Sequence, residues 1–340
     1  MDITNWFSTK VQVTDSTLPR FFILNEPGKV EIKYNLDNIK NYINIANIKW
    51  KWGKIPLKIM ISKNISDYTK HVFPEYNLKN KKNIIPILKS NVQKCIRRSK
   101  ETKAVASAYL LLNIDPSSIL RRLPIIYIED VHLDKSFVGI VWYMIAVSKG
   151  YMLSNKDVEW ILGVVSVLAR NNYREKLNKQ DKKSIENIEE FISKIPKNYY
   201  QLNFNVIWAL LIRHSYGGMK CDMRLILDTI KAYNIKVVSE IKIEPIKITS
   251  QISSFSSKHI ILPSVDFHCT NILTLLLKKY QLDNSYFKVY RECIWFNRSS
   301  ISDKIDLNGK TKYINHIDLY KCIKRDLDTL STQIINNTFV

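Results

Sequence analysis

The amino-acid sequence predicts a mainly α-helical protein of the α+β class, with a small N-terminal β-containing module and a short β hairpin late in the chain. Three observations support this prediction. Hydrophobic residues make up 46% and charged residues 24% of the 340 residues, which is typical of a globular chain. Strand-like apolar runs are concentrated between residues 21 and 63. Apolar residues at helical spacing dominate after about residue 84.

The N-terminal β module is predicted from three short apolar runs at residues 21–24, 30–34 and 56–61. Pro27 and Gly28 mark a turn between the first two runs. We therefore expect a β-containing module over residues 11–83, preceded by a tail at residues 1–10.

The helical body is predicted from capping signals and apolar stripes. Ser154 and Asp157 form a capping-box pattern in front of a stripe at residues 158–168. Similar stripes predict further helices over residues 184–195, 204–213, 219–233, 270–280, 286–296 and 317–335. Residues 235–248 alternate apolar and polar positions, which predicts the late hairpin. The expected units are a helical domain at residues 84–234 and a mostly helical C-terminal region at residues 235–340.

The charge balance restricts the class of partner. The chain has 52 Lys and Arg residues against 31 Asp and Glu residues, a formal net charge of +21. Such an excess favours a polyanionic partner, above all DNA bound through its phosphates. The richness in Asn, Ile, Lys and Tyr indicates an AT-rich genome, such as that of a large DNA virus.

The cellular setting is predicted from what the sequence lacks. The first ten residues contain Asp2 and Lys10 and have no apolar core, so no secretory signal is expected. The longest apolar run, residues 137–147, is too short to span a bilayer, so no membrane partner is expected. Five scattered cysteines without a C-x-x-C pair indicate a reducing compartment. An intracellular location follows, either the nucleus or a viral replication site in the cytoplasm.

One stretch of spaced elements has the order of a known family. It contains K-C-I-R-R-S-K-E from Lys94, an alanine-rich run at 104–112, Asp115-Pro116, Arg121-Arg122-Leu123, and Ile128-Glu129-Asp130-Val131. This stretch resembles the helical C-terminal region of the RarA/MgsA/WRNIP-type clamp-loader-like AAA+ proteins, loosely over residues 88–170. The sequence departs from that pattern at His132, where the family has Gly, and at Pro124. The resemblance implies a role at replication forks and in recombination, with DNA binding or clamp-loader-like assembly.

The ATPase part of that family is not expected here. No G-x-x-x-x-G-K-[ST] segment occurs in the sequence, so the phosphate-cradling loop of an ATP site is missing. We therefore expect no cofactor, and the sequence favours a non-catalytic protein over an enzyme. A homo-oligomer or association with a separate ATPase subunit is left open.

A basic cluster supplies the predicted DNA-binding residues. Lys94, Arg97 and Arg98 lie at i, i+3 and i+4, on one face of a helix, where they can meet successive phosphates. The full predicted set is Lys89, Lys94, Arg97, Arg98, Lys100, Lys103, Arg121 and Arg122. The alternative is a solvated helix face, and for Arg121 and Arg122 it is pairing with Glu129 and Asp130 inside the fold.

The N-terminal tail resembles a sliding-clamp-binding peptide of the PCNA-interacting type. Ile3, Trp6 and Phe7 match the aliphatic residue and aromatic pair of that pattern, although its leading Gln is missing. One 3₁₀ turn places these side chains on one side, where they can fill an apolar pocket. The alternative is that the tail docks on its own core.

Other clusters have simpler structural interpretations. Trp50 and Trp52 share one face of a strand and can stack bases, but they more often fill a small β core. The turn at residues 215–220 can present amides to a phosphate, but a plain helix entry is the simpler interpretation. His268 and Cys269 have no second pair at zinc spacing, so no metal site is expected.

Three functions follow from these observations, in decreasing order of support. The first is a non-catalytic DNA-binding accessory factor of replication, recombination or repair. The second is a structural or virion-core protein that packs nucleic acid. The third is a metal-dependent nuclease using Glu240, Lys242 and Asp266, which lacks an Asp on a preceding strand.

Overall fold

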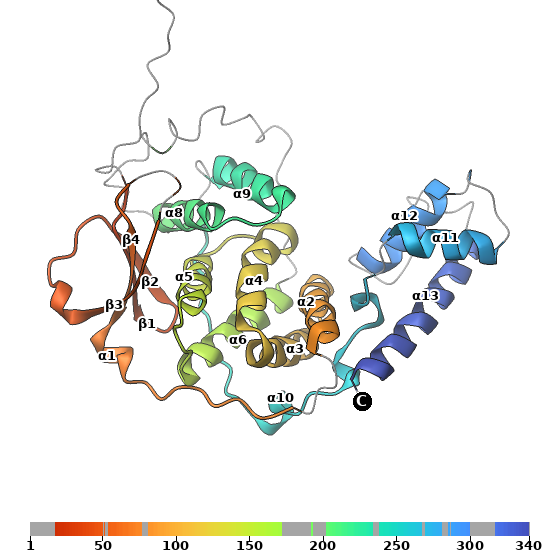
Figure 1. The fold of residues 1–340 in the computed structure, drawn as a ribbon, viewed down its shortest axis with the longest axis horizontal. Helices are drawn as coiled ribbons and strands as arrows, with labels where there is room; N and C mark the ends of the chain where they lie inside the picture. Colours follow the sequence, from red (N-terminus) through yellow and green to blue (C-terminus); the bar gives the residue numbers. More distant parts are fainter. Residues whose placement is uncertain are drawn as a thin grey trace, which may run out of the picture. The chain divides into compact units, whose positions relative to one another are not determined.

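The computed structural model gives a mainly helical chain with one small sheet (Figure 1). It describes residues 18–49, 51, 54–76, 81–171, 192, 202–233, 238–266, 269–280, 285, 287–299 and 317–339. The chain divides into two compact units built from interleaved segments. Unit 1 contains Met1–Val72, Leu120–Val164 and Tyr173–Ile246, and unit 2 contains Phe73–Ile119, Val165–Asn172 and Lys247–Val340. The predicted α+β class, with its N-terminal sheet, is confirmed.

The sheet of unit 1 has the strand order β2-β1-β4-β3. Its strands are β1 (Phe21–Glu26), β2 (Lys29–Lys33), β3 (Tyr42–Ile48) and β4 (Leu57–Ser62). β1 and β4 pair in parallel at the centre, with Phe22 opposite Ile59, and both strands are largely buried. Gly28 closes the β1–β2 hairpin with a φ of +77°, and its missing side chain leaves room for the Trp160 ring.

One strand was missed because it lies at the edge of the sheet. β3 alternates apolar residues with Asn44 and Asn47, both of which are exposed. An edge strand buries little, so its apolar signal is weak. β3 pairs antiparallel with β4 and ends at Ile48, immediately before the first lysine of the site described below.

Helices cover the sheet of unit 1. The buried helix α5 (Ser136–Ser148) packs against the sheet, and the Trp142 Nε1 donates to the Phe22 carbonyl at 3.0 Å (Figure 1). This bond satisfies the indole of a side chain that is fully buried. The other helices and turns of this unit are α1 (Lys63–Ser66), η2 (Ile39–Asn41), α8 (Leu202–Ser215) and α9 (Lys220–Tyr233).

Two helices cross the division between the units along the chain, and the second begins at a predicted signal. α4 (Pro116–Asp130) begins with Pro at its first position, after Asp115 accepts from the Ser118 amide at 3.0 Å. α6 (Asn155–Arg170) begins at the predicted capping box. The Asp157 carboxylate accepts from the Ser154 amide at 2.8 Å, and the Ser154 hydroxyl accepts from the Asp157 amide at 3.2 Å.

The late hairpin is not formed by the described residues of its range. Residues 238–246 form no helix or strand, and a single bridge joins Ser239 to Asp134. The segment lies against α6, where the Ile246 amide donates to the Glu159 carbonyl at 3.0 Å and Gly163 allows a close approach of Glu244. The alternation therefore arises from one chain with a buried side, not from two paired strands.

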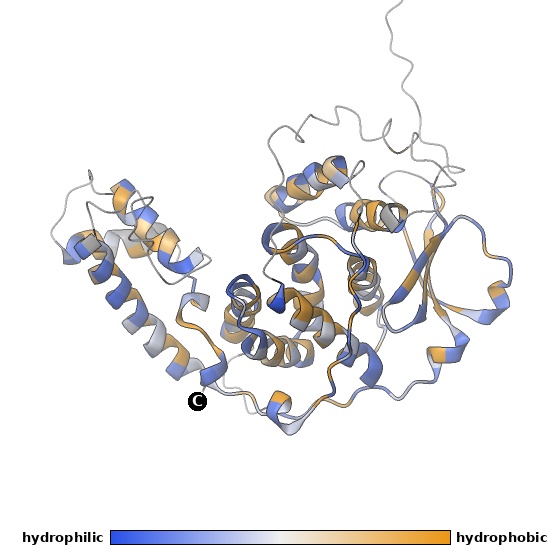
Figure 2. Ribbon diagram, turned by 180° about the vertical axis from the view of Figure 1, so that it is seen from behind, coloured by the Kyte–Doolittle hydropathy of each residue, from blue (hydrophilic) through white to orange (hydrophobic). Residues whose placement is uncertain are grey.

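Unit 2 is helical. Its helices are α2 (Lys81–Arg97), α3 (Glu101–Ile114), α10 (Ser250–Ser253), η4 (Ser257–His259), η5 (Leu262–Ser264), α11 (Cys269–Lys279), α12 (Phe287–Ser299) and α13 (Ile317–Thr338). The predicted helices over 204–213, 219–233, 270–280, 286–296 and 317–335 are thus all present. A cluster that includes Tyr290, Ile323 and Leu327 forms a core among α11, α12 and α13, while polar residues follow much of α13 (Figure 2). The predicted helix over 184–195 lies outside the described residues apart from Ile192.

Candidate functional site

The first part of the predicted basic cluster is buried inside unit 2. Lys94 is 6% exposed, and its Nζ donates to the Pro263 carbonyl at 2.7 Å and pairs with the Asp266 carboxylate. Burial lowers the pKa of the Lys94 ammonium, and the pairing with Asp266 opposes that shift. Lys94 therefore holds the η5 segment against α2 and does not present its charge to solvent.

The two neighbouring arginines bind the C-terminal end of α12. The Arg97 Nη1 donates to the Ser299 carbonyl at 2.9 Å, and the Arg98 Nη2 donates to the Asn297 carbonyl at 3.1 Å. The last carbonyls of a helix have no partner within it and carry the negative end of its dipole, so cations are favoured there. We call Lys94, Arg97 and Arg98 with these carbonyl partners the α2 clamp.

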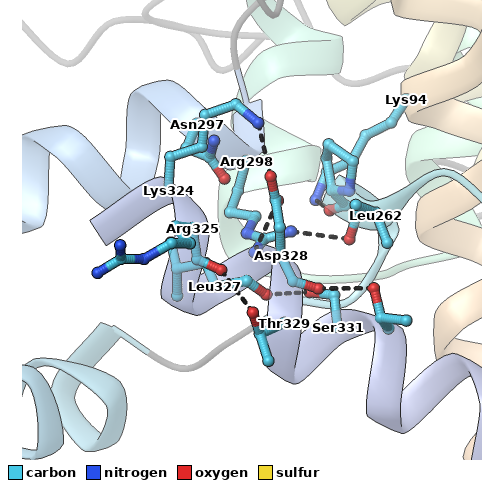
Figure 3. Close-up of polar contacts among 12 residues, drawn as sticks. Lys94, Leu262, Asn297, Arg298, Lys324, Arg325, Leu327, Asp328, Thr329 and Ser331 are labelled. Atoms are coloured by element: carbon cyan, nitrogen blue, oxygen red, sulfur yellow. Dashed lines mark hydrogen bonds and ion pairs between the residues drawn. The ribbon is translucent and has the colours of Figure 1, made fainter. Parts of the chain in front are cut away.

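A second buried cation extends this network (Figure 3). The Arg298 Nη1 donates to the Leu262 carbonyl at 2.8 Å, and its Nη2 lies 3.7 Å from the Asp328 carboxylate. Lys324 pairs with the same carboxylate at 2.5 Å. Burial lowers the pKa of Arg298 to about 10, which leaves it charged at neutral pH. The network joins α12, α13 and η5.

The remaining predicted DNA-binding residues are scattered among different environments. Lys103 donates to the Lys258 carbonyl at 2.6 Å, and Arg122 lies 3.9 Å from the Glu129 carboxylate. Lys89 is half-buried, whereas Lys100 and Arg121 are exposed. The expectation of one phosphate-facing helix surface is therefore wrong for Lys94 and Arg98. Helical spacing identified a common face, but that face is bound by the distant residues Pro263, Asp266, Asn297 and Ser299.

A basic cavity lies in unit 1. Its volume is about 360 Å³, and it is formed where the end of β3, the C-terminal end of α5 and the C-terminal end of α8 meet. Its lining residues are Asn47, Ile48, Lys49, Lys149, Ile212, Ser215 and Tyr216. None of these is acidic, in contrast to the α2 clamp and its carboxylate partner.

The lysines of this cavity are available for a ligand. Lys49 and Lys149 are exposed, and neither forms an ion pair with a residue that the structure describes. Arg121 lies over the Tyr216 ring, with its guanidinium carbon 5.7 Å from the ring centre. Lys49 and Lys149 thus line the cavity, and Arg121 from α4 lies over the Tyr216 ring that also lines it.

Burial, with a smaller contribution from neighbouring positive charges, lowers the pKa values of two residues behind the cavity. Burial, together with the nearby Lys51 and Arg213 charges, lowers the pKa of His214 to about 4. Burial and the Arg121 charge lower the pKa of Arg213 to about 10, and Asp222 opposes this shift. An anion bound at the cavity would be stabilised by the same field.

Local hydrogen bonds hold the cavity wall in place. Gly217, with a φ of +79°, ends α8 in the left-handed conformation, and its carbonyl accepts from the Arg213 Nη1 at 2.7 Å. The Ser215 hydroxyl accepts from the Lys51 amide at 3.1 Å, which joins α8 to the chain after β3. The Tyr216 hydroxyl bonds the Ser148 hydroxyl at the end of α5. The ring is therefore positioned before any ligand binds.

The sequence gives one signal for this cavity, the turn at residues 215–220, whose amides can meet a phosphate. Lys49 and Lys149 are not among the predicted DNA-binding residues. The structure brings Lys49 and Ser215 to one cavity with Lys149, although long stretches of chain separate the three. The tail with Ile3, Trp6 and Phe7, and also Trp50 and Trp52, lie outside the described residues.

The described structure does not support the alternative metal and nuclease sites. Among the described residues, no group of three His, Cys, Asp or Glu side chains is placed to hold a metal ion. Glu240 pairs with Lys135, and Asp266 pairs with Lys94. Both carboxylates of the nuclease hypothesis are thus bound to ammonium groups of the fold.

Comparison with known proteins adds no assignment: no family model, no curated protein and no solved structure matches the chain. The resemblance of residues 88–170 to the RarA/MgsA/WRNIP-type proteins therefore stays a prediction. Within the described part of the chain, no helix has both the length and the apolar composition needed to cross a membrane.

Proposed function

We propose that this chain binds nucleic acid through the phosphate backbone, as an accessory factor of DNA replication, recombination or repair. The single observation that carries the proposal is the basic cavity of unit 1, whose lysines are exposed while none of the described residues that line it is acidic. A net charge of +21 adds the long-range attraction that brings a polyanion to such a site.

The proposal moves the phosphate contacts away from the α2 clamp. Cations that bind helix-terminal carbonyls or carboxylates in the fold have to break those bonds before they can meet a phosphate. Lys49, Lys149 and Arg121 form no ion pair with a described residue, so no such pair has to break when they meet a phosphate. They are therefore the residues for which phosphate contact costs least.

A salt titration tests this proposal. We expect affinity for DNA to fall steeply between about 50 mM and about 200 mM salt, because phosphate contacts release counterions. On duplex DNA, the double variant Lys49→Gln/Lys149→Gln should reduce the magnitude of the slope of log K against log salt by about 1.8, the value for two lost phosphate contacts. The matched control is Lys40→Gln/Lys63→Gln, which removes two exposed lysines of the same unit that lie outside the cavity and form no ion pair with a described residue. Equal slopes for the two double variants would overturn the proposed site.

The same measurements separate the alternatives. A nucleic-acid-packing protein would bind with very high stoichiometry and would be indifferent to the cavity lysines. A nuclease would cut DNA in the presence of Mg²⁺ or Mn²⁺ and would lose that activity in Glu240→Ala.

The sliding-clamp partner rests on the sequence of the tail alone. Trp6→Ala/Phe7→Ala should abolish capture of a PCNA-like clamp while DNA affinity stays unchanged, because the phosphate contacts lie elsewhere. Clamp capture by the variant at the wild-type level would remove this partner from the proposal.

A further inference from the structure

We infer that the basic cavity takes one unpaired nucleotide of a single-stranded nucleic acid, with its base against Tyr216 and its phosphates on Lys49 and Lys149. This inference rests on the proposed function and names the substrate class of the same site. Three features of the cavity carry it: its size, its mixed lining and the prior positioning of its aromatic ring.

The size fits a single nucleotide and excludes a duplex from the interior. About 360 Å³ falls within the range of cavities that enclose small ligands. In a duplex the bases are stacked and paired, so only backbone and groove edges can touch a concave site. A base can enter a cavity of this kind only from a single strand, or after it has left the stack.

The cavity lining contains apolar and uncharged polar groups that a phosphate does not require. Ile48, Ile212 and the Tyr216 ring supply apolar surface, while Asn47 and Ser215 supply hydrogen-bonding groups without charge. Asn44 donates to the Asn47 Oδ1 at 3.3 Å, and the Asn47 Nδ2 makes no hydrogen bond with a described residue. A site for phosphate alone gains nothing from the apolar wall, whereas a nucleobase needs both kinds of surface.

The aromatic ring is already oriented for stacking. Tyr216 is held at its hydroxyl by Ser148 and packs beneath the Arg121 guanidinium. Aromatic rings and guanidinium planes are the surfaces on which unpaired bases stack. Because the ring needs no rearrangement, little ordering cost opposes binding.

Fluorescence anisotropy with four probes tests the inference in the full-length chain. The probes are labelled oligothymidylate, labelled oligouridylate, a labelled DNA duplex of matched length, and inorganic polyphosphate as an unlabelled competitor. We expect both single strands to bind more tightly than the duplex, and the ratio between them to show whether the site distinguishes DNA from RNA. Tyr216→Leu should weaken single-strand binding about ten-fold, the effect of losing one stacked base. It should leave duplex binding and polyphosphate competition unchanged.

Two control variants separate stacking from structural damage. Tyr216→Phe keeps the ring and loses the hydroxyl, and Ser148→Ala removes the same hydrogen bond from its other side. Both should weaken single-strand binding by clearly less than Tyr216→Leu does, because the ring that stacks on the base remains and only its positioning bond is lost. If Tyr216→Leu does not fold, Asn47→Ala on the opposite element should still weaken the single strands selectively.

The outcomes distinguish the two levels of the proposal. Duplex binding as tight as single-strand binding, or equal losses for all probes in Tyr216→Leu, would overturn the nucleotide site and leave phosphate binding intact. No measurable binding of any of the four probes at low salt would overturn the proposed function itself.

Discussion

The two basic regions of this protein place similar side chains in opposite environments. In the α2 clamp, Lys94 and Arg98 are buried and bind carbonyls or a carboxylate of their own chain. At the cavity of unit 1, Lys49 and Lys149 are exposed, and no described residue of the lining is acidic. A high density of Lys and Arg in sequence therefore does not locate a polyanion site. A cation that already binds a carbonyl or carboxylate of its own chain is less able to bind a phosphate than one that does not.

The largest expected effect lies in the clamp region, at Asn91. This side chain is fully buried; its Nδ2 donates to the Ser107 hydroxyl at 2.6 Å, and its Oδ1 accepts from the Ile261 amide at 3.0 Å. Asn91→Leu leaves several buried groups without partners, each costing about 1–3 kcal/mol. We expect a loss of more than about 3 kcal/mol in the free energy of unfolding, measured by urea denaturation.

The matched control for Asn91→Leu is Asn83→Leu, at an exposed position of the same helix. It should change the free energy of unfolding by less than about 0.5 kcal/mol. Similar effects of the two substitutions would show that α2 does not hold the segment after η4. The structural role assigned to the clamp region would then be wrong.

The next effect is a dependence of stability on pH at the cavity. The pKa of His214 is about 4 in the folded chain, against an ordinary value of 6.5. Between these values the unfolded chain binds more protons, so the free energy of unfolding falls as the pH decreases from about 6.5 to about 4. This shift corresponds to about 3 kcal/mol at most. Denaturation of wild type and His214→Gln across this pH range isolates the contribution of His214 from that of the carboxylates.

The same histidine reports on the ligand. A bound phosphate opposes the positive field of Lys51 and Arg213, so polyphosphate should raise the pKa of His214 as followed by NMR. A His214 that titrates near 6.5 without ligand, or whose pKa does not respond to saturating polyphosphate, would contradict the field described for the cavity.

Local patterns predicted the elements well, and long-range contacts explain what they missed. The capping box at Ser154 and Asp157 and the turn at Asp115 are complete within a few residues, so the sequence specifies them directly. β3 was missed because an edge strand needs few apolar residues. The burial of Lys94 depends on Pro263 and Asp266, which are far along the chain. No local pattern indicates which segment will cover a helix face.

The candidate site illustrates the same limit. Lys49, Lys149 and Tyr216 each follow or end a different element, and only the packing of β3, α5 and α8 places them at one cavity. The positive charge predicts a polyanionic ligand from the sequence, whereas the location proposed for it depends on the tertiary structure. A basic residue at the end of a strand or helix is a better candidate than one inside a regular stripe, because fewer intramolecular partners surround it.

The smallest expected effect comes from a direct comparison of one clamp cation with one cavity cation. Arg98→Gln removes a charged donor from the Asn297 carbonyl at the end of α12, which should lower the free energy of unfolding by about 2 kcal/mol. Its affinity for single-stranded DNA should equal that of the wild type at a temperature where both are folded. Lys149→Gln should do the reverse, with stability within about 0.5 kcal/mol of the wild type and weaker binding. If Arg98→Gln weakens binding as much as Lys149→Gln does, buried clamp cations contribute to the ligand's field, and the division between structural and ligand-binding cations fails.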